Sequence, residues 1–253
     1  IDSLCDIVPA VKPQCAYYEM YGWQGVKALY DTIAYAKEKG MYVITDGKRN
    51  DIGTTMEAYA AAHLGEVKVN DKTFEPFGAD ALTVNGYLGS DGIKPLLNIC
   101  REKDKGIFVL VKTSNPSSGE LQDKPIGDSP TLYREMGALC ENWGEELMGE
   151  TGYSGVGAVV GATYPDQLTE LRKALPHTFF LVPGYGAQGG SAANLAGAFD
   201  ENGIGAIVNA SRSIMCAYKK EENCDEKDYA AASRREAIRM RDDITSFIPA
   251  LKK

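Results

Sequence analysis

Short apolar runs alternate along this chain with longer segments in which apolar residues recur at helical spacing. Each run has about the length of a buried β-strand, and polar residues follow it directly. The runs cover residues 7–12, 42–45, 81–84, 107–111, 156–160, 179–182 and 206–209. Strands and helices that alternate in this way predict an α/β fold built on a parallel sheet.

The segments between the runs predict amphipathic helices. In residues 22–39 apolar positions recur at roughly helical intervals, and Gly40 stands where a C-terminal helix cap is expected. Further helices are predicted at 54–63, 92–101, 131–149, 165–175, from after Gly190 to about residue 202, and at 228–247. Residues 66–79 are expected to form a polar insertion, and residues 117–128 a mobile loop.

The polar residues that follow the strands favour one α/β architecture. A (β/α)8 barrel builds its active site at the C-terminal ends of its strands. We therefore expect residues 1–253 to form a single (β/α)8-barrel domain, also called a TIM barrel. Seven strands are predicted rather than eight. Because too few residues precede Lys12 for a further strand and helix, we expect the natural N-terminal βα segment to be missing from this sequence. The alternative is a doubly wound open sheet, which normally has a glycine-rich loop after an early strand, whereas here that loop follows the penultimate one.

Charge restricts the possible partners. The 253 residues include 27 Lys and Arg against 35 Asp and Glu, which gives a net charge of -8. This excess of acidic groups argues against DNA or RNA as a partner. An anionic small molecule would need a locally positive pocket.

The cysteines and the lack of long apolar runs indicate a cytoplasmic protein. The six cysteines are dispersed, without the paired spacing of a zinc site or a disulfide framework. No apolar run approaches the length of a membrane span, and no signal-peptide pattern opens the sequence. We therefore expect reduced thiols, a cytoplasmic location and no contact with membranes.

A dense group of charges follows the apolar run at 42–45. Asp46 and Lys48 alternate along an extended segment, so both can project to the same side, with Asp51 a turn further on and Lys12 at the end of an adjacent strand. Opposite charges at such spacing favour the ionised form of each member, as a catalytic array requires. The structural alternatives are a solvated turn with an incidental ion pair, or a salt-bridge network at the barrel rim.

Two loops near the C-terminus predict a phosphate site. The glycine-rich loop at 184–190 follows the penultimate strand, and Asn209-Ala210-Ser211-Arg212 follows the last one. In a (β/α)8 barrel these two loops commonly bind a phosphate. Arg212 suits this task because a guanidinium group donates two parallel hydrogen bonds. For the glycine-rich loop alone, a plain turn is the alternative.

Other kinds of catalytic chemistry have little support in the sequence. His63 lies in a predicted helix and His177 beside a proline, so a Ser-His-Asp triad is not expected. No metal-ligand spacing is evident, although carboxylates at strand ends remain candidate magnesium ligands. We predict no metal site and no cofactor.

Six segments carry a resemblance to a known family, namely residues 11–14, 46–55, 83–89, 112–116, 161–165 and 182–190. Together they resemble the orotidine 5'-phosphate decarboxylases, specifically the larger bacterial subgroup, over nearly the whole chain. The resemblance implies a homodimeric barrel without metal or cofactor. Such an enzyme converts orotidine 5'-phosphate to UMP and carbon dioxide in pyrimidine synthesis.

The resemblance also implies roles for individual residues. The expected catalytic residues are Lys48, as the cation and proton donor to C6, with Asp46, Lys12 and Asp51. Ile52 and Thr55, like Asp51, match residues lent to the active site of the partner subunit. Ser114 matches the residue that meets the pyrimidine, Gln188 the one that bridges base and phosphate, and Arg212 the phosphate arginine. The expected substrate-binding set is completed by Pro183, Gly186, Gly189 and Ser211.

One feature departs from the family pattern. The family's ribose-binding aspartate lies at the end of the first strand, which this sequence does not show. Asp2 and Asp6 are poor substitutes because they precede the strand that ends at Lys12. Two alternatives stay open: a magnesium-dependent sugar-phosphate decarboxylase of the same superfamily, and a non-catalytic fragment that binds UMP.

Overall fold

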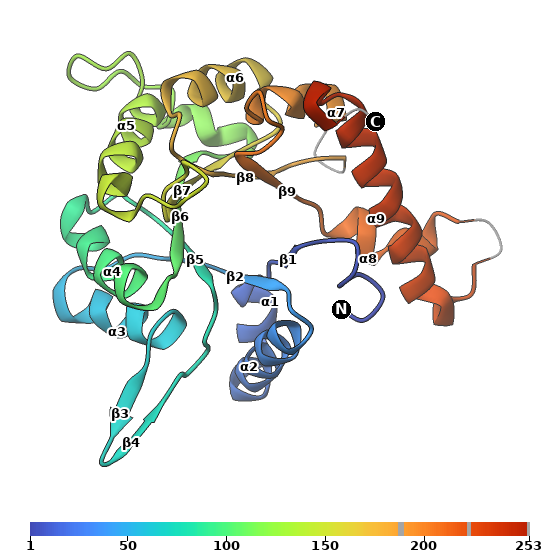
Figure 1. The fold of residues 1–253 in the computed structure, drawn as a ribbon, viewed down its shortest axis with the longest axis horizontal. Helices are drawn as coiled ribbons and strands as arrows, with labels where there is room; N and C mark the ends of the chain where they lie inside the picture. The colour runs from blue at the N-terminus through green and yellow to red at the C-terminus, as the bar shows by residue number, and fades with distance from the viewer. Residues whose placement is uncertain (187–189, 222–223, 252–253) are drawn as a thin grey trace. The chain divides into compact units, whose positions relative to one another are not determined.

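The computed structural model describes residues 1–186, 190–221 and 224–251 (Figure 1). Its residues divide into two compact units. We call residues 9–110 and 143–157 the N-terminal unit, and residues 1–8, 111–142 and 158–253 the C-terminal unit. Two strands, β6 (Gly106–Lys112) and β7 (Val156–Val160), have residues in both units.

The first half of the sheet consists of parallel strands separated by helices. Its strands are β1 (Ala10–Val11), β2 (Tyr42–Arg49), β5 (Ala81–Val84) and β6 (Gly106–Lys112). The helices are α1 (Cys15–Glu19), α2 (Gly22–Glu38), α3 (Gly53–His63) and α4 (Ser90–Lys103). Each strand pairs with the one before it, as the alternating pattern of the sequence predicts.

The second half of the sheet continues the same pattern. Its strands are β7 (Val156–Val160), β8 (Phe180–Pro183) and β9 (Ala206–Asn209), with parallel pairing of β8 to both neighbours. The helices are α5 (Leu132–Gly144), α6 (Pro165–Ala174), α7 (Ala192–Leu195), α8 (Arg212–Met215) and α9 (Tyr229–Ser246). Short 3-10 helices are η1 (Pro116–Glu120), η2 (Glu145–Leu147), η3 (Ala196–Ala198), η4 (Ala217–Lys219), η5 (Glu226–Asp228) and η6 (Pro249–Leu251).

The strand order is β1-β2-β5-β6-β7-β8-β9, so neighbours in the sheet are also successive parallel strands in the sequence. Every residue of β5 and β7 is buried. Strands that read as continuous apolar runs are buried on both faces, with helices supplying the cover. The α/β class and the seven predicted strands of a barrel-type fold are therefore confirmed.

Local structure differs from the sequence predictions in several places. The strand predicted at residues 7–12 is limited to Ala10–Val11. Residues 2–7 form turns, with local bonds such as Val8 N–H to the Leu4 carbonyl (3.0 Å). The predicted helix at 131–149 ends at Gly144, and the one that follows Gly190 ends with η3.

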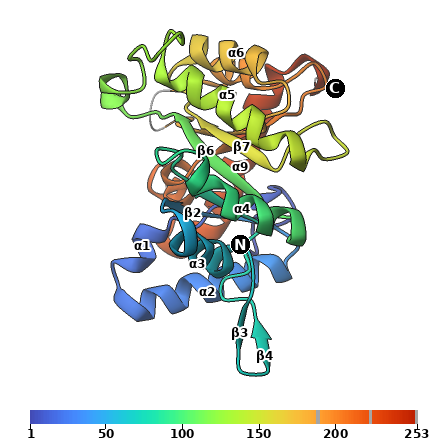
Figure 2. The same cartoon turned by 90° about the vertical axis from the view of Figure 1, so that its left-hand side faces the viewer.

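The insertion at 66–79 contains an antiparallel hairpin that the sequence pattern did not predict. Its strands are β3 (Val67–Val69) and β4 (Lys72–Phe74), and Figure 2 shows them projecting away from α3. Both strands have three residues and are largely exposed, so they lack the apolar alternation that marks a longer strand. Asn70, at φ 54°, makes the turn, which suits a residue type that tolerates the left-handed region. In the described ranges, no helix is long and apolar enough to cross a membrane.

Candidate active site

A buried carboxylate on β2 is the centre of the candidate site. Asp46 is 5% exposed. It forms ion pairs with Lys12 and with the Nζ atom of Lys48, the latter at 2.6 Å. Gln14 Nε2 donates to Oδ2 at 3.0 Å, and Thr83 Oγ1 donates to Oδ1 at 2.8 Å. Both carboxylate oxygens are therefore bonded, and each accepts from one ammonium group.

The local backbone turns Lys48 toward Asp46. The pairing of β2 with β5 shifts register between Thr45 and Arg49, and Lys48 adopts φ 48°. Its backbone N–H donates to Thr83 Oγ1 at 3.0 Å, so one threonine holds both Lys48 and Asp46. A non-glycine residue in this conformation costs about 1 to 3 kcal/mol, and such strain concentrates at functional sites.

Electrostatics keep Asp46 ionised. Burial raises the pKa of its carboxyl group, but the ammonium groups of Lys12 and Lys48 outweigh that effect and bring the pKa below its ordinary value. The side chain of Lys48 is 45% exposed, against 16% for Lys12. Lys48 is therefore the ammonium group of this cluster that a ligand can reach most easily.

Asp51 does not join this cluster in the chain described here. Its carboxylate instead accepts a hydrogen bond from the backbone N–H of Ile52 at 2.8 Å. Ile52 is 51% exposed, and Thr55 in the first turn of α3 is exposed as well. The structure thus brings together three of the four predicted catalytic residues and leaves the fourth beside exposed positions.

The described ends of the glycine-rich loop that follows Pro183 are hydrogen-bonded to each other. Gly186 N–H donates to the Gly190 carbonyl at 2.8 Å, and Gly190 N–H donates to the Gly184 carbonyl at 3.1 Å. A Cβ atom on Gly190 would lie 2.8 Å from both the Ala162 Cβ and the Gly184 carbonyl oxygen, so only glycine fits. The predicted site residues Gln188 and Gly189 lie outside the described residues.

The remaining predicted binding residues follow β6 and β9. Ser114, two residues after β6, is half-buried, and its carbonyl accepts from Thr163 Oγ1 at 3.3 Å. Ser211 and Arg212 are exposed at the start of α8. Nearby on the chain, Asn209 Oδ1 is buried with no hydrogen-bond partner among the described residues.

Two polar residues of the site had no predicted role. Gln14 and Thr83 both bind Asp46, and both fall within segments that carried the family resemblance. Neither has a charge, and their function comes from the register of β1, β2 and β5. The available signal was their position within an apolar run, for Thr83, and shortly after one, for Gln14.

Among the described residues, the histidines and the acidic groups form no alternative metal centre. His63 is buried and stacks on Phe77 with 5.0 Å between ring centroids, which gives it a place in the packing of the N-terminal unit. Across the part of the chain that the structure describes, no group of three or more His, Cys, Asp or Glu side chains is arranged to hold a metal ion.

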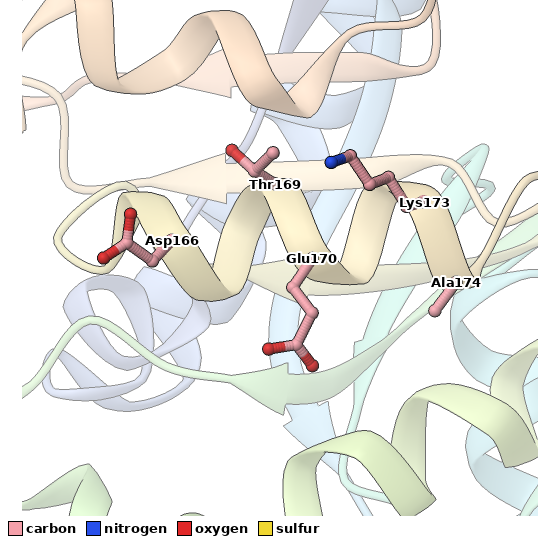
Figure 3. A pocket seen from close by; sticks show the side chains of 5 residues that line it. All are labelled: Asp166, Thr169, Glu170, Lys173 and Ala174. Atoms are coloured by element: carbon pink, nitrogen blue, oxygen red, sulfur yellow. The ribbon is translucent and has the colours of Figure 1, made fainter.

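A surface hollow of about 490 Å³ lies elsewhere, along one helix of the C-terminal unit. Figure 3 shows that its five lining residues all belong to α6, namely Asp166, Thr169, Glu170, Lys173 and Ala174. Tyr133 and Arg134 of α5 bond to Glu170. None of the predicted site residues lines this hollow, so it has no part in the candidate site.

Comparisons with known proteins point to one family. Residues 1–226 match the model of the Orotidine 5'-phosphate decarboxylase / HUMPS family. The chain is 48% identical over 247 residues to the orotidine 5'-phosphate decarboxylase of Rhodopirellula baltica, which covers 96% of this chain and 80% of that protein. It is 46% identical over 235 residues to that of Caldicellulosiruptor bescii, with coverage of 92% and 77%.

A solved structure shows the same similarity in three dimensions. The crystal structure of a putative orotidine 5'-phosphate decarboxylase from Streptomyces avermitilis superposes with a TM-score of 0.76 at 35% identity. The match covers 96% of this chain and 79% of the other.

Proposed function

This chain belongs to the Orotidine 5'-phosphate decarboxylase / HUMPS family, and we propose that Lys12, Asp46 and Lys48 perform the chemistry of its reaction. That reaction is the decarboxylation of orotidine 5'-phosphate to UMP and carbon dioxide, a step of pyrimidine biosynthesis. The observation that supports this assignment is the Asp46 carboxylate bonded to two ammonium groups, one of them partly exposed.

The chemical need explains why a lysine stands at the reacting carbon. When the bond from C6 to the carboxylate breaks, the electron pair stays on C6 in an orbital that no adjacent carbonyl can delocalise. Stabilisation must then come from a positive charge already in place. Lys48 supplies that charge, then transfers an ammonium proton to C6, and water reprotonates its amine after UMP forms.

Asp46 and Lys12 set the charge of the site. Two ammonium groups and one carboxylate leave a net charge of +1, which favours an anionic substrate on a chain whose overall charge is -8. Asp46 holds Lys48 in place and lies beside the departing carboxylate, where its charge disfavours the ground state. Lys12 keeps Asp46 ionised.

Binding residues at a distance from C6 complete the proposal. Arg212 and the loop of Pro183, Gly186, Gln188 and Gly189 bind the phosphate together with Ser211, and Ser114 meets the pyrimidine. Phosphate binding supplies free energy that holds the base in the reacting geometry. The exposed position of Arg212 at the start of α8 supports its proposed role in binding the phosphate.

We also propose a homodimer with shared active sites, in which Asp51, Ile52 and Thr55 reach the site of the partner subunit. The exposure of Ile52 and Thr55 supports this, since an apolar side chain such as Ile52 gains from burial at an interface. Sedimentation at micromolar concentration is expected to give the mass of a dimer, and a strictly monomeric mass would contradict the shared site.

The free cysteines support a cytoplasmic location, where thiols stay reduced. Fractionation of the source cells is expected to recover the enzyme with the cytoplasm, and recovery outside the cell would contradict this.

The experiment that tests the activity follows the absorbance of orotidine 5'-phosphate after the protein is added. We expect the substrate absorbance to fall, with the same rate in the presence of EDTA. Loss of the rate with EDTA, together with turnover of a sugar phosphate, would instead indicate the magnesium-dependent alternative, which the names of the relatives do not favour. Binding of UMP with no turnover would indicate a non-catalytic protein.

A further inference from the structure

A lysine outside the catalytic cluster is completely buried in the C-terminal unit. Lys112 is the last residue of β6, and its side chain has no exposed surface. Burying an ammonium group is costly unless a carboxylate and hydrogen bonds compensate for the lost water. The proposed mechanism gives Lys112 no task, so its burial needs another explanation.

The ammonium group of Lys112 is surrounded by residues of the segment that follows β6. It donates to Asp123 Oδ1 at 2.6 Å and to Ser118 Oγ at 3.4 Å. It also lies over the rings of Tyr164 and Tyr133, at 4.4 and 5.5 Å from their centroids. Such cation–π contacts are stronger where water is excluded.

These contacts continue as a chain of hydrogen bonds to the backbone next to Ser114. Ser118 Oγ donates to the Tyr164 hydroxyl at 3.3 Å, and that hydroxyl donates to the Asn115 carbonyl at 3.4 Å. Lys112 is therefore linked, through Ser118 and Tyr164, to the carbonyl of Asn115, the residue that follows Ser114.

The residue before Ser114 is fixed by the same segment. Gln122, the neighbour of Asp123, accepts from Thr113 N–H at 2.9 Å and donates to Thr113 Oγ1 at 2.8 Å. The segment predicted as a mobile loop thus folds around the Lys112 ammonium group. Opening it would separate the buried cation from Asp123, which is unfavourable because an unpaired charge would stay behind.

We propose that Lys112 is a positioning residue that holds the segment 113–123, and through it Ser114, in the conformation that receives the pyrimidine. This inference rests on the proposed role of Ser114 in substrate binding. Lys112 does not touch the substrate, and its effect on the reaction passes through the backbone on either side of Ser114.

A double-mutant cycle between Lys112→Met and Ser114→Ala tests the proposal. Methionine keeps an unbranched side chain and removes the charge. We expect each single variant to lower kcat/KM for orotidine 5'-phosphate by about 10- to 100-fold, the scale on which a small misplacement acts. If Lys112 acts through Ser114, the kcat/KM of the double variant is little lower than that of the less active single variant. Losses that multiply in the double variant would overturn the proposal.

Lys105 provides a matched control at the other end of the same strand. It directly precedes β6, its side chain is 11% exposed, and it pairs with Asp80 at 3.3 Å. Lys105→Met is expected to lower stability while kcat/KM stays within about twofold of the wild type, since it lies outside the network that holds Ser114. Equal loss of kcat/KM in both lysine variants would show a general structural effect and overturn the specific role of Lys112.

A measurement independent of activity separates this inference from the proposed function. Amide hydrogen exchange of residues 113–123 is expected to be faster in Lys112→Met than in the wild type, and unchanged in Ser114→Ala. Unchanged exchange in Lys112→Met would overturn the positioning role, whatever the activity. A wild-type protein inactive on the substrate would overturn the proposed function, while the exchange result would still report on Lys112.

If Lys112→Met does not fold, Asp123→Asn replaces it in both experiments. The Asp123 side chain is 44% exposed, so this variant removes the counter-charge without emptying a buried space. The same loss of kcat/KM and of amide protection is expected, and wild-type values of both would overturn the proposal.

Discussion

Burial disfavours the charged form of both Asp46 and His63, but only Asp46 has oppositely charged partners that outweigh this effect. Two ammonium groups hold Asp46 ionised despite its burial. His63 is buried without a partner for Nδ1 among the described residues. Burial, helped by the charge of Arg49, therefore lowers the pKa of His63 from 6.5 to about 4.

This low pKa predicts a loss of stability in mild acid. Between about pH 6.5 and pH 4 the unfolded chain takes up a proton at His63 that the folded protein does not, so the free energy of unfolding falls as the pH falls. The shift corresponds to roughly 3 kcal/mol. Urea unfolding at pH 7 and pH 4 should show this loss in the wild type and a smaller loss in His63→Phe. Equal pH dependence in the two proteins would contradict the assignment.

The residues of the site differ in how far the sequence could identify them. Asp46 and Lys48 stand out because charges directly follow an apolar run. Thr83 could not be assigned, because a neutral side chain gains its role only from the register of β2 and β5. The sequence did not distinguish Lys112 from the other polar residues at strand ends. Its burial depends on Asp123, which lies eleven positions further along the chain.

At the scale of elements, strands with continuous apolar runs were predictable, whereas short or exposed elements were not. The β3–β4 hairpin and α1 have too few residues to show a period. At Gly190, by contrast, the structure explains why the sequence has a glycine, because close packing on Ala162 leaves no space for a side chain.

The tight packing of Gly190 predicts that Gly190→Ala damages both stability and binding. We expect a cost of about 1 to 3 kcal/mol in urea unfolding, as for other overpacked positions. UMP affinity measured by calorimetry should fall by about tenfold or more, which corresponds to 1.4 kcal/mol.

Gly40→Ala is the control for this loop prediction. Gly40 has φ 76° and no atom within 4 Å of an added Cβ, so only backbone strain of about 1 to 2 kcal/mol is expected. UMP affinity should stay unchanged in this variant. Wild-type affinity in Gly190→Ala would contradict the role of the loop in phosphate binding.

At the scale of the whole molecule, the alternating pattern of strands and helices predicted the parallel sheet. Such a pattern does not show whether all regions of the chain unfold together. The structure contains two compact units, while β6 and β7 contribute residues to both. Because each of these strands belongs to both units, we expect residues 1–253 to unfold as one domain.

Urea unfolding followed by far-UV and near-UV circular dichroism tests this expectation. The two signals should change in one coincident transition, as cooperative unfolding requires. Two separated transitions would contradict the prediction of a single domain.

The central claim is that Lys48 stabilises the charge on C6 and delivers the proton, and the most direct test compares Lys48→Ala with Lys27→Ala. Lys27 is a suitable control because its side chain is 62% exposed on α2 and pairs with Asp31 within the same helix. The measurement is kcat/KM for orotidine 5'-phosphate by loss of substrate absorbance. We predict a fall of about 10³-fold or more for Lys48→Ala, the combined scale of charge stabilisation and proton transfer, and no change for Lys27→Ala. A loss of roughly tenfold is what the removal of a single ordinary contact would cause. A Lys48→Ala enzyme whose kcat/KM stays within that factor of the control would therefore contradict the account.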